Sequence, residues 1–301
     1  MKLEIKHVTK QFKEKTAVDS FSMTIESGEC VGLIGPNGAG KSTLIKMISN
    51  ISDPSSGEIF LDGKPISSQK KEIGYLPQYP NFFSWMTAKE TLFFMGELSG
   101  LTKDQLTSII PTILSKVGLN GEENRKVSTF SGGMKQRLGI AQTLLHKPSL
   151  IIMDEPVSAL DPIGRREVLN IIEEIKKETT ILLSTHILND AEEICERFVI
   201  IKNGKKIEDT TLSDLLNRHH QHKISFELTT KNDQWITLIE QLPYVKNVES
   251  IGKKVKIEVE DVENNKTLLL AHALEHQISF VKFEVNHDSL EEIFLKLVVE
   301  K

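Results

Sequence analysis

The stretch that decides the fold of this chain is Gly35-Pro36-Asn37-Gly38-Ala39-Gly40-Lys41-Ser42. It fits the phosphate-loop pattern G-x-x-x-x-G-K-[ST] at every fixed position. The apolar run 30–34 before it is typical of a buried strand, and a helix-compatible run that includes Thr43 follows it. Glycines in such a loop let backbone N–H groups converge on phosphate oxygens, and the helix start adds its positive dipole end. The sequence therefore predicts that residues 35–43 bind a nucleoside triphosphate.

Charged and polar side chains complete the predicted site. Lys41 is expected to place its charge on the outer phosphates, and Ser42 to give its hydroxyl to Mg²⁺. A second apolar strand, 150–153, ends in Asp154 and Glu155. We expect Asp154 to hold the Mg²⁺ at the carboxyl end of that strand, and Glu155 to act as general base on the attacking water. A solvated turn is the alternative for this acidic pair, and the complete phosphate loop makes it the weaker one.

A second anion-binding helix start is predicted at Ser131, Gly132 and Gly133. Serine is favoured as the residue that caps a helix start, and the two glycines expose backbone N–H groups. A γ-phosphate needs one helix start from each side. Two copies of the chain, arranged head to tail, would supply them.

The order of strand-like and helix-like runs indicates the fold class. Strand patterns surround the phosphate loop, and helical patterns dominate from about residue 80 to 146. Strand–helix alternation returns after residue 149, with a helix predicted at 165–177. This alternation predicts a P-loop α/β domain with a mixed, mainly parallel sheet and an inserted helical subdomain. We expect this nucleotide-binding domain to span residues 1–215. Within the inserted part, Thr87 with Glu90 and Thr102 with Gln105 fit the capping-box pattern of a helix start.

The last part of the chain, residues 216–301, is predicted to form a small α+β domain, because 301 residues exceed what one core usually organises. Its predicted elements are a strand at 223–228, a helix at 233–242, paired strands at 245–251 and 254–260, a helix at 265–276 and a strand at 278–285. That order, β-α-β-β-α-β, is the ferredoxin-like pattern. A terminal helix from Ser289 to about Val299 follows, with Glu292 completing a capping box.

Taken in order, these motifs resemble the nucleotide-binding subunit of an ABC transporter over roughly residues 1–215. The resemblance implies ATP and Mg²⁺ as cofactors, and it implies that the segment led by Ser131 contacts ATP held by the other subunit. It further implies that Gln78 senses Mg²⁺ and relays ATP occupancy to the helical subdomain. His186 would contact the γ-phosphate and orient the attacking water, and Asp161 would link the two sites across the dimer.

Three further positions qualify the resemblance. Phe12 matches the position whose ring stacks on adenine, and ordinary strand packing is the alternative. The family signature usually has the sequence Leu-Ser-Gly-Gly-Gln, whereas this chain has Phe130 and Met134 at the two ends. The anion-binding core of the signature remains, so we expect only a modest weakening of dimer closure.

The end of the chain, 289–297, resembles ATPases of the drug, bacteriocin and bacitracin-type efflux branch (ABC-2 type). The implied function is an ATPase that powers a separately encoded membrane permease, for export of a drug, peptide antibiotic or similar substrate. The alternative is a soluble ABC-type ATPase acting on nucleic acid or ribosomes. A single phosphate loop, no Cys cluster and a net charge of −5 disfavour it, so no nucleic-acid partner is expected. Intact Glu155 and His186 oppose a third reading, a binder that does not hydrolyse ATP.

The sequence also indicates in which cellular compartment the protein is expected. Cys30 and Cys195 are the only cysteines and are expected to be buried, reduced thiols. The first residues lack the apolar core of a signal peptide, and no run approaches the ~18 apolar residues of a membrane span. We therefore expect a cytoplasmic protein that is peripheral on the inner face of the membrane through its permease.

Two weaker patterns remain open. The aromatic stretch 79–85 follows Gln78 and is a candidate groove for a short helix of the membrane partner, with packing inside the helical subdomain as the alternative. A histidine-rich tract at 219–222 has metal-ligand residue types, but no carboxylate or cysteine framework surrounds it. We expect this tract to be a solvated linker.

Overall fold

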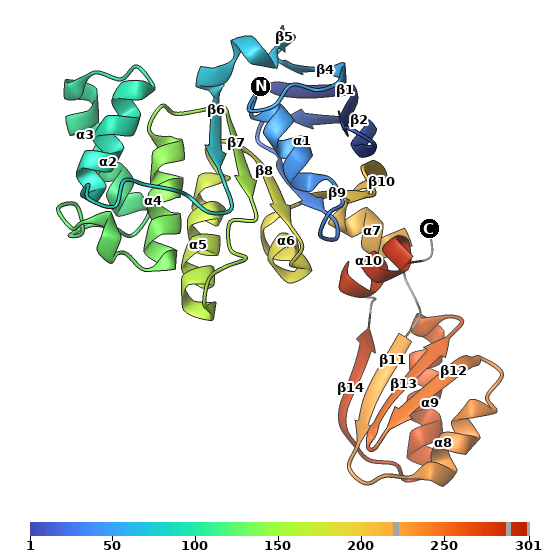
Figure 1. Cartoon of the computed structure of the whole chain (residues 1–301). Helices are drawn as coiled ribbons and strands as arrows, with labels where there is room; N and C mark the ends of the chain where they lie inside the picture. Colours follow the sequence, from blue (N-terminus) through green and yellow to red (C-terminus); the bar gives the residue numbers. More distant parts are fainter. Residues whose placement is uncertain (219–222, 287–289, 300–301) are drawn as a thin grey trace. The chain divides into compact units, whose positions relative to one another are not determined.

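The computed structural model describes residues 1–218, 223–286 and 290–299. The chain falls into two compact units, Met1–Leu212 and Ser213–Lys301. The first has two sheets and the second has one, and each unit has its own apolar core (Figure 1). The predicted fold class is confirmed in both parts.

A six-stranded, mainly parallel sheet forms the centre of the first unit, with the strand order β10-β9-β3-β8-β7-β6. The strands are β3 (Cys30–Ile34), β6 (Ile73–Leu76), β7 (Leu150–Asp154), β8 (Thr180–Thr185), β9 (Arg197–Lys202) and β10 (Lys205–Thr211). All neighbours are parallel except β10, which runs antiparallel to β9. Strands β3, β7 and β8 are buried along their whole length, which explains their unbroken apolar sequences. Their carboxyl ends lie in register, so the segments that follow them emerge at one edge.

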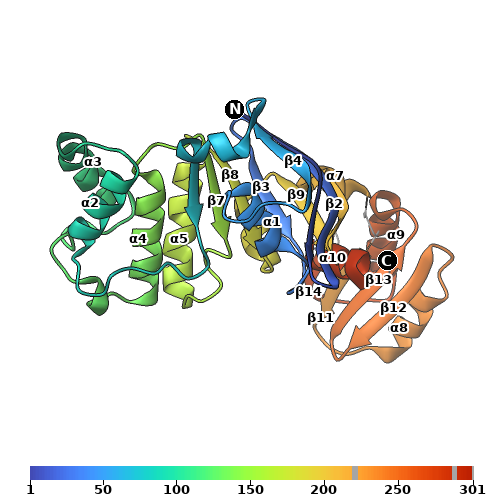
Figure 2. The same ribbon diagram turned by 45° about the horizontal axis from the view of Figure 1, so that its top comes forward.

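A second, antiparallel sheet has the order β2-β1-β4-β5. Its strands are β1 (Lys2–Phe12), β2 (Lys15–Glu26), β4 (Ser56–Leu61) and β5 (Lys64–Pro65). Helix α1 (Lys41–Ile48) shares one apolar core with both sheets, and buries Leu44 and Ile48 completely. Figures 1 and 2 show α1 between the two sheets. Complete burial of such a side chain contributes roughly 1.5–3 kcal/mol, so this core holds the helix that follows the phosphate loop.

The helical part contains α2 (Ala88–Leu98), α3 (Lys103–Lys116) and α4 (Gly132–Leu144). Both predicted capping boxes are present, with reciprocal bonds between Thr87 and Glu90 and between Thr102 and Gln105. A side chain at Gly96 of α2 would place its Cβ 2.2 Å from Leu106 Cδ2, so this glycine allows α2 and α3 to approach closely.

Two helices follow the strands β7 and β8 in the sequence. Helix α5 (Pro162–Ile175) begins three residues before its predicted start, because Asp161 caps it and Pro162 occupies its first position. Helix α6 (Leu188–Ile194) follows β8. The thiols of Cys30 and Cys195 are buried and form no disulfide, as expected from the sequence, and their sulfur atoms are hydrogen-bonded at 3.8 Å. A hydrogen bond to Cys30 and burial raise the pKa of the Cys195 thiol.

The second unit has a four-stranded antiparallel sheet in the order β12-β13-β11-β14. This is the ferredoxin-like arrangement that the predicted element order implies. Its elements are β11 (Lys223–Leu228), α8 (Asp233–Glu240), β12 (Val245–Ile251), β13 (Lys254–Val259), α9 (Val262–Glu275) and β14 (Phe280–Asn286), with α7 (Leu212–Arg218) before them and α10 (Leu290–Val299) after them. Phe226 and Trp235 pack edge to face in its core, with ring centroids 5.5 Å apart.

Some predictions fall outside the described residues. The histidine-rich tract 219–222 and Ser289, the expected first residue of the terminal capping box, are among them. Across the residues that the structure does describe, no helix combines the length and the apolar character that crossing a bilayer requires.

Candidate functional site

The phosphate loop joins β3 to α1 in a conformation that glycine permits. Gly38 and Gly40 have φ angles of 80° and 111°, in the left-handed region. A Cβ at Gly40 would lie 2.4 Å from the carbonyl oxygen of Ala17, so a side chain there would clash with the backbone of β2. The N–H of Leu44 bonds to Gly40 O at 2.9 Å, whereas the N–H groups before it have no carbonyl of their own helix to bond. The loop and helix start therefore expose the donors that an anion needs.

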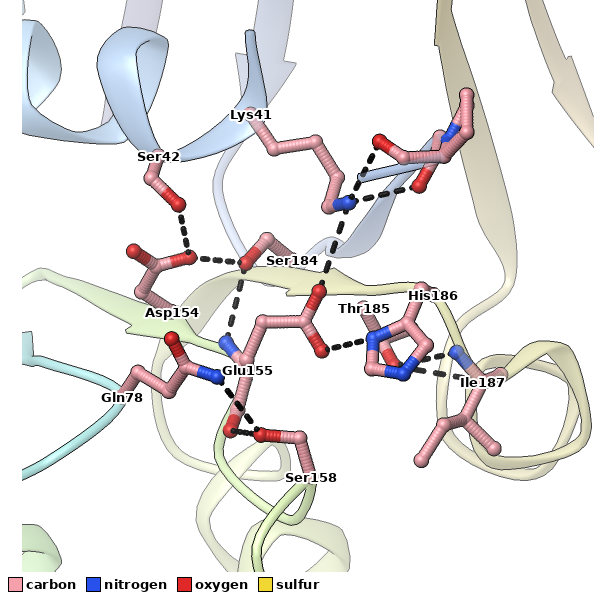
Figure 3. A network of polar contacts seen from close by, with 12 residues as sticks. Lys41, Ser42, Gln78, Asp154, Glu155, Ser158, Ser184, Thr185, His186 and Ile187 are labelled. Atoms are coloured by element: carbon pink, nitrogen blue, oxygen red, sulfur yellow. Dashed lines mark hydrogen bonds and ion pairs between the residues drawn. The ribbon is translucent and has the colours of Figure 1, made fainter. Parts of the chain in front are cut away.

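Lys41 is a buried cation at the start of α1. Its Nζ donates to the carbonyl oxygens of Gly35, at 2.7 Å, and Pro36, at 3.3 Å. It also forms an ion pair with Glu155 Oε1 at 3.5 Å, and both side chains are nearly inaccessible. The ammonium group thus lies between the loop carbonyl oxygens and the acidic strand end (Figure 3).

Asp154 and Ser42 bring oxygen atoms together opposite the loop. The hydroxyl of Ser42 donates to Asp154 Oδ1 at 3.2 Å, and Ser184 Oγ donates to the same oxygen at 2.6 Å. Asp154 of β7 pairs with Ser184 of β8, so the sheet register sets this contact. A carboxylate beside a hydroxyl is the oxygen donor set that Mg²⁺ prefers. The residues present therefore fit a Mg²⁺ ion bound beside a triphosphate.

Glu155 adopts an unusual backbone conformation directly after β7. Its φ is 50°, in the left-handed region, which a residue with a side chain adopts only at a cost of order 1–3 kcal/mol. Its N–H bonds to both the carbonyl and the hydroxyl oxygen of Ser184, each at 3.1 Å. In this position its Oε2 lies 2.7 Å from His186 Nδ1, while Oε1 faces Lys41. The carboxylate thus lies between the lysine and the imidazole (Figure 3).

Gln78, which follows β6, is linked to the same strand end. Its amide Nε2 donates to Ser158 Oγ at 3.2 Å, and that hydroxyl donates to the carbonyl oxygen of Glu155 at 3.1 Å. The segment that leads into the helical subdomain is therefore joined to the acidic pair by two hydrogen bonds.

A cavity of about 400 Å³ opens in front of these groups. Its lining contains Phe12, Lys15, Ala17, Asn37, Gly38, Ala39, Gly40, Lys41, Ser42, Thr43, Gln78, Glu155 and His186. Phe12 is 53% exposed, with Lys10 Nζ 5.3 Å from its ring centroid, so its ring is not packed in the apolar core of the first unit. The structure therefore gathers most of the predicted site residues around one hollow.

The second predicted helix start does not line this cavity in the described part of the chain. Ser131 caps α4 by accepting a bond from Met134 N at 3.2 Å, and Asp161 caps α5 by accepting one from Gly164 N at 2.7 Å. Glycines 132 and 133 lie against the start of α5, where a Cβ at Gly133 would be 3.6 Å from Gly164 Cα. One chain thus carries the phosphate loop and the second helix start at separate places.

Sequence reasoning assigned no role to two serines that hold the site together. Ser184 is fully buried and bonds to Asp154 and Glu155, and Ser158 bridges Gln78 to Glu155. Lys15 and Ala17, which line the cavity from β2, were also missed. In the sequence, Ser184 lies two residues before His186, and Ser158 lies three residues before Asp161. Their hydrogen-bond partners could not be predicted, because these depend on which strands are neighbours.

Comparisons with known proteins match both units. The ABC transporter family matches residues 18–158, and the family described as ATP-binding protein DrrA1-3-like, C-terminal domain, matches residues 211–298. The Bacillus subtilis ABC transporter ATP-binding protein YxlF, itself uncharacterized, is 41% identical, with 98% of this chain and 99% of that protein covered. The linearmycin resistance ATP-binding protein LnrL of B. subtilis is 35% identical (98% and 97% covered). The bacitracin transport ATP-binding protein BcrA of Bacillus licheniformis is also 35% identical (97% and 95%).

A solved structure is similar over most of the chain. The ATP-binding cassette MJ0796, determined as a dimer in a post-hydrolysis state with ADP and phosphate, superposes with a TM-score of 0.64 at 25% identity. The match covers 70% of this chain and 98% of that one. These findings confirm the resemblance to the efflux-type ATPases that the motifs and the tail indicated. By both its sequence and its fold, this chain belongs to the ATP-binding proteins of ABC transporters and is an ATPase that uses ATP with Mg²⁺.

Proposed function

We propose that this chain hydrolyses ATP in the 400 Å³ cavity to power a separate membrane permease that exports a drug, peptide antibiotic or similar compound. The observation that carries the proposal is the Glu155 carboxylate, held between Lys41 Nζ at 3.5 Å and His186 Nδ1 at 2.7 Å at the cavity wall. Export is supported by the relatives named for linearmycin resistance and bacitracin transport.

The residues around the cavity suggest how the reaction proceeds. Phosphate oxygens would replace the carbonyl oxygens of Gly35 and Pro36 as partners of Lys41, and the exposed N–H groups of the loop would bind the remaining charge. Glu155 would accept a proton from a water molecule as that water's oxygen bonds to the γ-phosphorus and the bond to the β–γ bridging oxygen breaks. His186 would hold the γ-phosphate and the water in line. ADP and inorganic phosphate are the products.

The bound metal ion would contribute electrostatic stabilisation. We assign Ser42, Asp154 and Gln78 as the residues that hold Mg²⁺, which neutralises charge on the β- and γ-phosphates when bound. Phe12 is assigned to the adenine, because its exposed ring offers a π-face at the cavity wall.

A second copy of the chain would complete the site. Because Ser131, Gly132 and Gly133 do not line their own chain's cavity, we propose that they bind the γ-phosphate held by the partner copy. Asp161 would then lie at the contact between the two copies. ATP would close the dimer by binding the closed state more tightly than the open one.

The permease is proposed to dock on the aromatic stretch after Gln78, on the cytoplasmic face of the membrane. Tyr79 and Trp85 are 63% and 66% exposed, and Phe83 contacts both Trp85 and Phe94 with ring centroids 4.8 and 5.7 Å apart. The stretch therefore both packs against α2 and offers apolar surface to a partner helix.

Two substitutions test the site. In the Glu155→Gln variant the carboxamide cannot take the proton, so we expect phosphate release to stop while ATP-dependent dimerisation, measured by sedimentation, is kept. The Lys41→Ala variant should lose ATP binding itself in a titration calorimeter, because the charge on the outer phosphates is gone. Phosphate release at the wild-type rate by Glu155→Gln would refute its role as base, and tight ATP binding by Lys41→Ala would refute the loop assignment.

A pull-down tests the partner. The tagged chain, recovered from a detergent extract of its own host, is expected to bring down a multi-span membrane protein. Recovery of ribosomes or DNA without any membrane protein would overturn the transport proposal.

A further inference from the structure

Helices α5 and α6 are joined by an ion pair whose carboxylate is buried. Arg165 of α5 donates from Nε at 2.8 Å and from Nη2 at 2.5 Å to one oxygen, Oδ1, of Asp190 on α6. The Asp190 side chain is only 4% exposed, whereas Arg165 is 33% exposed. Two charge-assisted bonds on one oxygen fix both the distance and the orientation of the two helices at this point.

The pair is costly to keep in the folded chain. Asp190 Oδ2 is buried and has no hydrogen-bond partner among the described residues. Burial raises the pKa of Asp190, although Arg165 opposes the shift. A carboxylate whose burial outweighs its pairing contributes little net stability, so stability alone does not explain its presence.

The position of each partner connects it to the proposed machinery. Arg165 is four residues after Asp161, and its N–H bonds to the Asp161 carbonyl oxygen at 2.9 Å within the first turn of α5. Asp190 is four residues after His186 and lies in the first turn of α6. On either side of His186, Ile187 N donates to Thr185 Oγ1 at 2.9 Å, which restricts the backbone at the end of β8. The pair therefore joins the segment that carries Asp161 to the segment that carries His186.

We propose that Arg165 and Asp190 are positioning residues, which hold His186 against Glu155 by fixing the start of α6 to the start of α5. The inference rests on the proposed roles of Glu155 and His186. Neither residue lines the ATP cavity, so neither would contact ATP itself. A displacement of about 1 Å at a reacting group is enough to cost up to 100-fold in rate, so loss of the pair should lower turnover and leave ATP binding intact.

The same two helices offer a matched control. Arg166 of α5 forms an ion pair with Glu193 of α6, and these side chains are 61% and 44% exposed. This second pair has the same charges and joins the same helices. It lies in solvent, however, where such pairs contribute little.

The test compares single variants of the full chain by kcat and KM for ATP. Asp190→Asn and Arg165→Gln are each expected to lower kcat about tenfold, with KM for ATP changed less than twofold. Arg165→Lys should recover part of the loss, because it keeps the charge without the paired bonds. Glu193→Gln and Arg166→Gln should stay within twofold of the wild type.

A double-mutant cycle separates positioning from a general loss of structure. If the pair acts through His186, Asp190→Asn should have no further effect on phosphate release in a His186→Ala background. The imidazole resonance of His186, assigned by its loss in His186→Ala, should shift in Asp190→Asn and not in Glu193→Gln.

Three results would overturn the inference. They are unchanged kcat in both Asp190→Asn and Arg165→Gln, a full further loss in the His186→Ala background, or equal losses in the Glu193→Gln control. The proposed site is judged separately, because turnover by Glu155→Gln would refute it. If Glu155→Gln is inactive and Asp190→Asn is fully active, only the positioning role of the Arg165–Asp190 pair is refuted.

Discussion

At the scale of single residues, Phe12 offers a direct probe of nucleotide binding. Its ring is exposed at the cavity wall, and stacking on a base contributes about 1–3 kcal/mol. Phe12→Leu is therefore expected to weaken ADP binding roughly 5- to 150-fold by calorimetry, whereas Phe12→Tyr keeps the ring and the affinity. Phe60 is the matched control, because it also lies under a lysine, with Lys6 Nζ 4.9 Å from its ring centroid, and does not line the cavity. Equal affinities for Phe12→Leu and Phe60→Leu would contradict the stacking role.

Asp190 gives a pH dependence whose sign follows from burial. Desolvation raises its pKa in the folded chain, against the hydrogen bond and charge of Arg165, while Glu193 raises it further and His186 lowers it. Between the ordinary pKa of about 4 and the raised value, the folded state binds more protons than the unfolded state. The stability that this group contributes is therefore present at low pH and is lost as pH rises through the raised pKa.

Asp190→Asn removes this titration. We expect the melting temperature of the variant, relative to the wild type, to increase as the pH rises from about 4 to 7. The difference between the two melting curves isolates this carboxyl from the others in the chain. A difference that is flat, or that decreases with pH, would contradict the raised pKa.

The sequence predicted the site residues that belong to a local motif. It did not predict residues whose hydrogen-bond partner lies on a neighbouring strand. The loop residues and the acidic pair follow from local pattern and lie around one cavity. The role of Ser184 does not, because its bond to Asp154 exists only through the pairing of β7 with β8. The left-handed backbone of Glu155 is equally invisible in the sequence, since no glycine marks it.

At the scale of elements, the capping boxes are short sequence patterns that stabilise the helices they begin. Thr102 Oγ1 accepts a hydrogen bond from Gln105 N at 3.3 Å, and Gln105 Oε1 accepts one from Thr102 N at 2.8 Å. Thr102→Ala is expected to lower the free energy of unfolding by about 1 kcal/mol in urea titration. Thr107→Ala, on the exposed surface of the same helix, should change it by less than about 0.5 kcal/mol. Equal effects of the two substitutions would show that the cap contributes nothing of its own.

The predicted helix starts are correct where a threonine caps the helix. They lie three residues too late where an aspartate caps it. Both threonine-led boxes lie where expected, whereas α5 and α9 each begin three residues before their predicted starts. In both late cases an aspartate, Asp161 or Asp261, caps the helix without a glutamate or glutamine three residues on. Hydrophobic spacing alone locates the first buried turn, and the cap lies one turn earlier.

At the scale of the whole molecule, the alternation of strands and helices predicts the class of fold, but spatial order comes from the structure. The strand order β12-β13-β11-β14 places the first strand of the second unit inside its sheet, beside the last. Periodicity cannot show this, and only the ferredoxin-like element order made it expected. Completion of the ATP site by a second copy goes beyond any single chain, so it remains a proposal.

The two units, with separate apolar cores, are expected to unfold in two transitions. A ligand that binds only the native first unit stabilises it by about 4 kcal/mol at a thousand times its dissociation constant. For a unit of this size that raises the melting temperature by roughly 10 °C. Calorimetric scans with Mg·ADP should therefore shift one transition and leave that of Ser213–Lys301 in place. Lys41→Ala should abolish the shift without changing either transition in the absence of nucleotide by more than a few degrees. A single transition that moves as a whole would show instead that the two units unfold together.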